Sequence, residues 1–316
     1  MQDQRVFKGV DVSKDELVIA TEPAGAQLKL RNQPTAITRW LRTVSPQTYI
    51  AMEATGRYHR VLAQLAVQAG MRVYVLNARD VHFYAKALGR RGKTDASDAQ
   101  VIARYLAEHH RQLHPWAPGT AVQQRLGEML RRRAVMERHL SAIDDSLEGV
   151  ADLTRQRTAL TRYGNKLLAT LDQKIQALIA EDSGMREKQI QLQTITGVGP
   201  QVSAVLTALL GRIEFANVGA LIAYSGLDPR PKDSGLKRGR RSLTKRGPPA
   251  LRRMLWLAAF SASHSKAFTP MYQAIKSRGF SGTEALVILA RKLLRVAWAV
   301  WRTGQPFNPQ KVLPSA

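Results

Sequence analysis

The order of short apolar segments in the first third of the chain restricts the fold more than any other sequence feature. Residues 5–12 alternate apolar and polar side chains, a spacing typical of a β-strand. Residues 16–21 and 27–31 have the composition of two more strands, joined by a turn at 23–25. A helix is predicted at 34–44. The chain therefore begins with three meandering strands.

The next segments alternate between strand and helix patterns. Strands are predicted at 48–52 and 72–76, with a helix at 58–69 between them that ends before Gly70. A last helix at 95–110 is expected to bury a stripe formed by Ala99, Ile102, Ala103 and Leu106. This order is that of the ribonuclease H-like (RuvC-like) fold, a mixed five-stranded sheet with helices on its faces.

The middle of the chain is predicted to be helical. His114–Gly119 is a break, and residues 121–190 contain no proline. Two runs follow the 3-4-3 spacing of coiled coils, with 163–165 as an interruption; they are Leu140, Ile143, Leu147 and Val150, and Leu168, Leu171, Ile175 and Leu178. A hairpin packing on its own chain and pairing between chains both fit this pattern.

The charge of the chain indicates a polyanionic partner. The 316 residues include 48 Lys and Arg against 24 Asp and Glu, a net charge of +24. The excess is concentrated late in the sequence, because Glu284 is the only acid between Ser234 and Ala316. The absence of cysteine excludes disulfides and thiolate zinc sites. Charged residues interrupt the apolar run 286–301, which indicates an amphipathic helix rather than a membrane span. We expect a cytoplasmic nucleic-acid protein.

Four acids occur at spacings suited to a metal site on such a sheet. Asp11 and Glu53 end strand-like runs, and Asp95 and Asp98 stand three apart at the start of a helix, so that both lie on one helix face. Mg²⁺ prefers carboxylate oxygens and can support phosphodiester chemistry. Structural roles are the alternative: Asp95 can cap a helix, Asp98 can interact favourably with the helix dipole, and Asp11 can begin a turn.

Two later motifs favour contact with nucleic acid. Thr194–Pro200, which contains Gly197 and Gly199, resembles a helix-hairpin-helix turn that can approach a phosphate, although an ordinary turn between helices fits too. Residues 229–253 carry ten Lys or Arg and one acid. Ser234 in this basic stretch is a candidate nucleophile, with Ser242 as a rival and a phosphate-contacting serine as the structural alternative.

These pieces together resemble the DEDD-type insertion-sequence transposases, whose recombination is directed by a bridge RNA. The matching motifs run in family order over nearly the whole chain; they are Gly9–Lys14, Met52–Gly56, Lys93–Ala99, Gly197–Pro200, Tyr224–Pro229, Ser234–Gly235, Thr244–Gly247 and Leu251–Arg252. Two positions depart from the pattern, since Leu236 replaces a usual glycine and Thr244 a usual serine.

The resemblance implies a RuvC-like domain at 1–115, a coiled coil at 116–190 and a helical transposase domain at 191–316 with Ser234 as its catalytic serine. It implies Mg²⁺ held by Asp11, Glu53, Asp95 and Asp98. It also implies donor and target DNA, a bridge RNA, a dimer or tetramer formed through the coiled coil, and a place at the bacterial nucleoid. The expected nucleic-acid contacts are Gly197, Gly199, Lys237, Arg238, Arg240, Arg241, Lys245, Arg246 and Arg252.

Two other functions fit the same residues. In a plain Mg²⁺-dependent junction nuclease, water is the nucleophile and Ser234 is not needed. In a non-enzymatic nucleic-acid scaffold, the acids are structural. The role of Ser234 separates the recombinase from the nuclease, and dependence on a divalent metal separates both from the scaffold.

Overall fold

The chain divides into two units, Met1–Pro118 and Gly119–Ala316. The computed structural model describes residues 5–23, 25, 27–54, 56–89, 94–230 and 242–311. The hairpin and the C-terminal helices belong to one unit, so the boundary expected near residue 190 stays a prediction.

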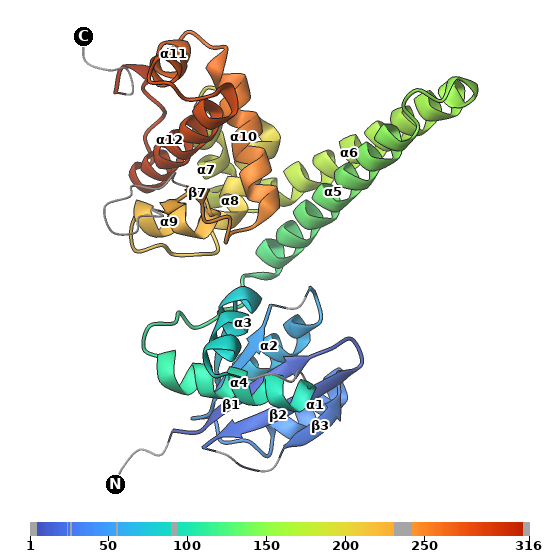
Figure 1. Ribbon diagram of the computed structural model, residues 1–316, viewed down its shortest axis with the longest axis vertical. Coiled ribbons are helices and arrows are strands. Elements are labelled where there is room, and N and C mark those ends of the chain that lie inside the picture. Colours follow the sequence, from blue (N-terminus) through green and yellow to red (C-terminus); the bar gives the residue numbers. More distant parts are fainter. Residues whose placement is uncertain are drawn as a thin grey trace. The chain divides into compact units, whose positions relative to one another are not determined.

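The first unit contains the expected mixed five-stranded sheet (Figure 1). Its strands are β1 Phe7–Val12, β2 Glu16–Glu22, β3 Leu28–Arg31, β4 Tyr49–Glu53 and β5 Arg72–Leu76. Their order is β3-β2-β1-β4-β5. The first three strands are antiparallel neighbours, whereas β4 runs parallel to both β1 and β5. The predicted fold class is therefore confirmed, and β1 is the middle strand.

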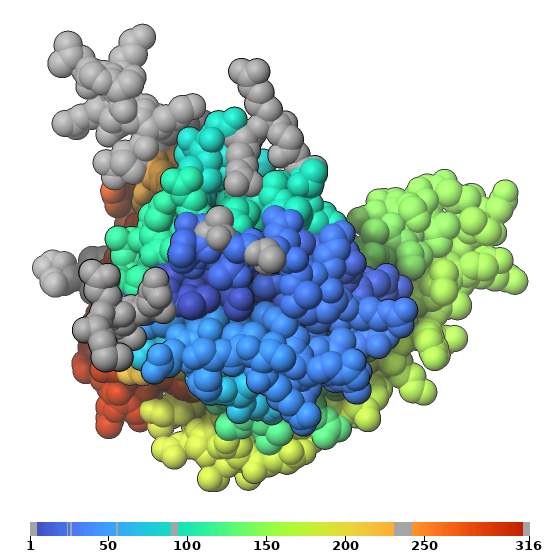
Figure 2. Space-filling model, turned by 90° about the horizontal axis from the view of Figure 1, so that it is seen from below, coloured from blue at the N-terminus to red at the C-terminus, as the bar shows by residue number. Residues whose placement is uncertain are grey.

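Helices cover both faces of this sheet because buried side chains alternate along its strands. One face packs Val10, Ile19 and Ile50 against α1 (Pro34–Leu41) and α2 (His59–Gln68). The other face packs Phe7 and Tyr49 against α3 (Ala78–Ala87) and α4 (Asp95–His109). Residues of this unit, blue to cyan, form one continuous body in the space-filling view (Figure 2).

Helix α3 was not expected from the sequence. The side chain of Asn77 accepts a hydrogen bond from the backbone N–H of Arg79 and so caps its N-terminus. Val81 is its only fully buried residue, and Tyr84, Ala85 and Leu88 pack partly buried in the same cluster, so its apolar stripe is short. In the sequence, Asn77 directly after the predicted strand 72–76 could have indicated that a helix begins there.

The second unit begins with a long helical hairpin (Figure 1). Helices α5 (Ala121–Ser146) and α6 (Thr154–Ala180) pack side by side. The expected interruption at 163–165 is wrong, because α6 continues through Gly164, which is buried beneath Leu140. The first 3-4-3 run also extends too far, since α5 ends before Val150, and Val150 is exposed. Pairing between chains stays a prediction.

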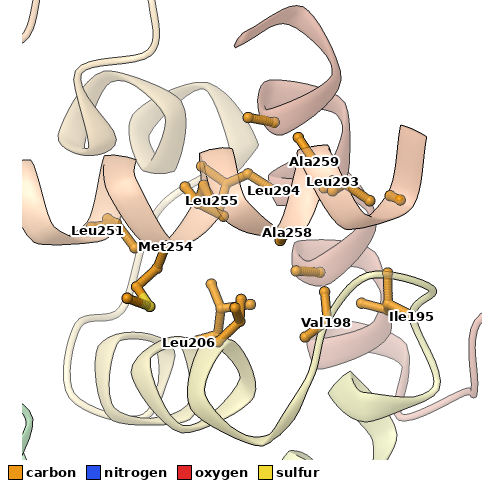
Figure 3. Packing of buried hydrophobic residues seen from close by; sticks show 14 of the residues in the cluster. Ile195, Val198, Leu206, Leu251, Met254, Leu255, Ala258, Ala259, Leu293 and Leu294 are labelled. Carbon is orange, nitrogen blue, oxygen red and sulfur yellow. The ribbon is translucent and has the colours of Figure 1, made fainter. Parts of the chain in front are cut away.

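The remaining helices of this unit share one large hydrophobic core. They are α7 Ser183–Gln193, α8 Pro200–Leu210, α9 Val218–Ser225, α10 Pro249–Ser263, α11 Thr269–Ser277 and α12 Gly282–Thr303. Leu206 of α8, Leu255 of α10 and Leu293 of α12 meet in this core (Figure 3). Among the described residues, every helix is too short or too polar to cross a bilayer.

Candidate active-site regions

Two of the four predicted acids come from neighbouring parallel strands. Gly9 pairs with Ala51 and Val10 with Met52 along the β1–β4 ladder. Asp11 and Glu53 are the next residues in this register, at the carboxyl ends of the two strands. Parallel neighbours in register share a sheet face, so the two carboxylates belong to the same edge and face.

Helix α4 crosses the sheet on this face, and Gly9 marks the crossing. A Cβ built on Gly9 would overlap the carbonyl oxygen of Ala99 and the backbone nitrogen of Ala103. Only glycine permits so close an approach of strand and helix backbones. Asp11 lies two residues beyond Gly9 and therefore shares the face that α4 covers.

The direction of α4 brings its first turn toward the two strand ends. Leu106, late in the helix, packs in a cluster with Phe7 at the start of β1. Ala99, near the beginning of the helix, packs with Val18, the residue paired with Asp11. Asp98 directly precedes Ala99, and Asp95 stands three residues earlier. The topology thus brings the strand ends that carry Asp11 and Glu53 and the first turn of α4 to one part of the sheet, here called the acidic corner; the grouping of the four side chains there stays a prediction.

The surroundings of these acids differ. Asp11, Glu53 and Asp98 are half-buried, whereas Asp95 is exposed. Thr94 caps α4 in a reciprocal hydrogen-bond pair with Ser97, so Asp95 is not the capping residue. Both helix acids stand in the first turn, where the helix dipole favours negative charge.

An all-carboxylate set of this kind matches the oxygen ligands that Mg²⁺ prefers. Within the described residues, however, no three acidic or histidine side chains lie close enough together to hold an ion. The backbone placement and donor chemistry of Asp11, Glu53 and Asp98 therefore fit a hard cation, and the assignment of the four acids as ligands stays a prediction.

The predicted catalytic serine belongs to residues 231–241, here called the serine segment, which lie outside the described residues. Lys237, Arg238, Arg240 and Arg241 fall in the same segment. Its two ends are described. They are paired as β6 (Pro229–Arg230) and β7 (Ser242–Leu243), an antiparallel ladder of two residue pairs. Ser242, the rival nucleophile, is exposed and pairs with Arg230.

Hydrogen bonds continue this ladder into the body of the unit. The backbone N–H of Thr244 donates to the carbonyl of Asp228 at 3.1 Å, and that of Lys245 donates to the carbonyl of Gly226 at 3.1 Å. The buried hydroxyl of Thr244 donates to the Asp228 carboxylate. Thr244, which departs from the family serine, thus keeps the hydroxyl function of that position.

Close backbone packing fixes the base of the serine segment. Gly226 has a positive φ of 70°, and a Cβ on Gly247 would overlap the carbonyl oxygen of Tyr224. The Arg252 guanidinium donates to the carbonyls of Gly247 at 2.5 Å and Ser225 at 3.3 Å. Burial lowers the pKa of this guanidinium. Arg252, expected to contact nucleic acid, is here bound to backbone, while Lys245 and Arg246 are exposed.

The predicted helix-hairpin-helix turn lies between α7 and α8. Gly197 has a φ of 90°, and a Cβ there would lie 2.5 Å from the carbonyl oxygen of Ala258 on α10. Close packing against α10 is therefore enough to require glycine at this position, and contact with a phosphate is not needed to explain it. Gly199 is exposed, with open space around a built Cβ, and stands at the N-cap of α8. Its contact with nucleic acid stays a prediction.

An acidic network also lies near the beginning of α8. Arg133 donates to both carboxylate oxygens of Asp172, at 2.5 and 3.1 Å, and to Glu137 at 3.2 Å. Gln201, in the first turn of α8, donates to Asp172 at 2.9 Å. A carboxylate here competes with a phosphate for the positive helix end. Arg133 and Asp172 are separated by 39 positions in the sequence, so local sequence patterns could not predict this ion pair.

The comparisons with known proteins agree with the arrangement of these two regions. The DEDD transposase model of the IS110 type matches residues 8–149. The model described as "Transposase IS116/IS110/IS902 family" matches residues 190–273. The two matches cover the acid-bearing sheet and the helices around the serine segment in the expected order. The chain belongs to the IS110-type DEDD transposases, and it is a DNA recombinase.

Curated relatives extend the similarity over most of the chain. Pilin gene-inverting proteins of Moraxella lacunata and Moraxella bovis are 29% identical over 280 residues, covering 86% of both chains. An uncharacterized 44.8 kDa protein of insertion element IS116 from Streptomyces clavuligerus is 24% identical, covering 96% of both. Enzymes of this family act on DNA and generally use a divalent metal.

Proposed function

We propose that this transposase cuts and rejoins DNA through a covalent bond to Ser234, assisted by Mg²⁺ at the acidic corner and directed by a bridge RNA. The β1–β4 register carries the proposal, because it brings Asp11 and Glu53 to one strand edge on the face that α4 covers. Both the acid region and the serine region fall within the transposase family matches, which supports a role for both in one reaction.

Asp11, Glu53, Asp95 and Asp98 would hold the ion. When bound, Mg²⁺ supplies positive charge that offsets the charge gathering on a phosphate under attack. The protein contributes a rigid frame for this. Asp11 and Glu53 are fixed by the central strand pair, and Asp98 by a helix whose backbone touches β1 at Gly9. Such rigidity suits Mg²⁺, which tolerates little departure from octahedral geometry.

Ser234 would be the nucleophile. Its Oγ bonds to phosphorus, its proton is removed, and the leaving sugar oxygen takes a proton as the strand breaks. Lys237, Arg238, Lys245 and Arg246 are close enough in sequence to offset the phosphate charge. The serine ester keeps the bond energy of the cut strand for rejoining. The gene inversion named for the Moraxella relatives is a rejoining reaction, which supports this chemistry over hydrolysis.

The proposal that a bridge RNA directs the reaction rests on the family resemblance and on the charge of the chain. The serine segment and its flanks carry ten cations between Pro229 and Arg253, enough to bind more than one strand. Nucleic acid that copurifies with the protein should contain a discrete non-coding RNA when sequenced. Recovery of DNA alone, with full recombination after ribonuclease treatment, contradicts this part of the proposal.

The acidic corner is tested by isosteric substitutions. Asp11→Asn and Asp98→Asn each remove one negative ligand and should abolish recombination in Mg²⁺ without changing the circular dichroism spectrum. Asp15→Asn is the matched control, because Asp15 is an exposed acid in the β1–β2 turn of the same unit. Normal recombination by either of the first two variants shows that the acids are structural.

The serine mechanism has its own test. Ser234→Ala should bind DNA yet form no covalent adduct with a nicked suicide substrate, whereas Ser242→Ala should keep both the adduct and recombination. Mass spectrometry of the digested adduct identifies the attached residue. Metal-dependent strand cleavage that persists in Ser234→Ala, with no adduct in the wild type, favours the plain nuclease instead.

A further inference from the structure

One face of α10 carries a row of aromatic rings that neither candidate region uses. Trp256, Phe260 and His264 are spaced by four residues and therefore lie on one helix face. Trp256 and Phe260 stack with centroids 5.7 Å apart and planes 15° apart, and His264 meets Phe260 edge to face at 4.9 Å. Phe260 is 48% exposed although it is fully apolar.

This row ends at a hollow of about 380 Å³ between α10, α11 and α12. Its walls include Phe260, His264, Thr269, Tyr272, Gln273 and Leu286. The volume falls in the range of about 300–1,000 Å³ that is usual for small-molecule sites. Two aromatic rings from different helices and a buried leucine give it apolar walls, which suit a flat ring system.

Polar groups at the rim can recognise the edge of such a ring. His264 Nδ1 lies 2.8 Å from the carbonyl oxygen of Phe260, which can only accept, so Nδ1–H is the donor of this hydrogen bond. This leaves Nε2 for a ligand. Tyr272 adds a hydroxyl and Gln273 an amide, so donors and acceptors are both present.

The charge around the hollow favours an anionic ligand. Lys276 Nζ lies 6.0 Å from the centre of the Tyr272 ring. Glu284 is the only acid from residue 234 to the end of the chain, and it is engaged in the N-terminal capping box of α12 with Ser281. A second copy of this chain would bring another strongly basic surface to the hollow, which like-charge repulsion opposes.

We propose that this hollow binds an unpaired base of single-stranded nucleic acid, with Phe260 and Tyr272 as its stacking surfaces and Lys276 close to the phosphate. A base in a duplex has both faces covered by its neighbours, so only an unpaired base can use such a site. The inference rests on the proposed function only in that the chain binds nucleic acid. It requires neither Ser234 chemistry nor a metal.

Fluorescence anisotropy of the full chain with labelled oligonucleotides tests the site. The probes are single-stranded oligothymidine, oligouridine and a DNA duplex, each about 12 nucleotides long, within the usual site sizes of single-strand binders. Phe260→Ala should weaken binding of the single strands about 5- to 100-fold, the usual effect of losing one stacked base. Tyr272→Ala should act in the same direction, and duplex affinity should stay unchanged.

The controls separate stacking from folding and from charge. Leu257→Ala removes a 38% exposed apolar side chain from the same helix outside the hollow and should bind all probes normally. Phe260→Tyr should restore single-strand binding, because it keeps a ring. The slope of log K against log salt should not change in Phe260→Ala, since no phosphate contact is lost.

The outcomes distinguish the possible ligands. Weakened binding of both single strands, or of the DNA or RNA strand alone, supports the site and shows which kind of nucleic acid it binds. Three results overturn it: normal single-strand binding by Phe260→Ala, equal loss on the duplex, or a lower oligomeric mass of that variant, which would mean that a second copy covers the ring. A wild type that forms the Ser234 adduct without binding single strands refutes this inference and leaves the proposed function standing.

Discussion

The close approach of α4 to β1 makes Gly9 a position where substitution should disturb the acid-bearing face of the sheet. In Gly9→Ala the new Cβ would overlap the carbonyl oxygen of Ala99 and the backbone nitrogen of Ala103, and would lie 2.8 Å from the Ala103 Cα. All three are backbone atoms of a helix, so no side chain can move aside. The helix must shift away from the sheet and carry Asp98 with it.

The cost can be approximated from overpacking in protein cores, which destabilises by about 1–3 kcal/mol. For a unit of this size, each kcal/mol lowers the melting temperature by about 4 °C, so we expect a decrease of about 4–12 °C. Recombination should fall further than stability alone requires, because a displacement of about 1 Å at a catalytic group can reduce a rate about 100-fold.

Thermal unfolding followed by circular dichroism measures the first effect, and hydrogen exchange within α4 shows whether the loss is local. Gly25→Ala is the matched control, because a Cβ there meets its nearest neighbour, the Thr21 Cβ, at an ordinary 3.7 Å. If the two variants have equal melting temperatures and recombine equally, α4 does not hold Asp98 against the sheet.

Two further predictions concern the helical hairpin. Arg133→Met leaves Asp172 without its partner in a largely buried ion pair and should lower the free energy of unfolding by about 3 kcal/mol, whereas Arg132→Met, in an exposed pair, should cost less than about 1 kcal/mol in urea titrations. The Arg157 guanidinium holds the pKa of Asp144 at about 2, below its ordinary 3.8. Because the folded pKa is the lower one, this pair stabilises above about pH 4 and loses its effect as pH falls to about 2. Arg157→Met should therefore be less stable than the wild type at pH 7 and equal to it near pH 2; a difference independent of pH would contradict this.

The sheet was predictable because its strands obey local rules. The predicted strand 72–76 coincides with β5, and the predicted helix 95–110 ends one residue beyond α4. Apolar spacing fixes such segments without reference to the rest of the chain. Helix α3 escaped prediction because its apolar stripe is short, with Val81 fully buried and Tyr84 and Ala85 only half-buried. Sequence patterns identify long, fully buried helix faces more readily than short, partly buried ones.

For the helical hairpin, the sequence pattern predicted more burial than the structure contains. The spacing of Leu140, Ile143, Leu147 and Val150 suggested one continuous buried seam, yet Ile143 is 44% and Val150 is 42% exposed. Gly149, with a φ of 79°, stands in the connection between α5 and α6, where a chain reversal favours glycine. Heptad spacing indicates which residues can share a helix face, whereas their burial depends on the side chains that pack against that face.

The acidic corner depends both on local sequence and on the tertiary packing of the sheet. The identity and order of Asp11, Glu53 and Asp98 can be read from the sequence, but their predicted grouping depends on the parallel pairing of β1 with β4 and on the passage of α4 over Gly9. Bringing several carboxylates to one corner is unfavourable, since like charges repel. The first turn of α4 offsets part of this cost, because its unpaired N–H groups present partial positive charge beside Asp98. The Thr94–Ser97 cap fixes where α4 begins, so four residues determine where this positive helix end lies. If α4 began one turn earlier, Asp95 and Asp98 would no longer stand in its first turn and would lose this favourable interaction with the helix end.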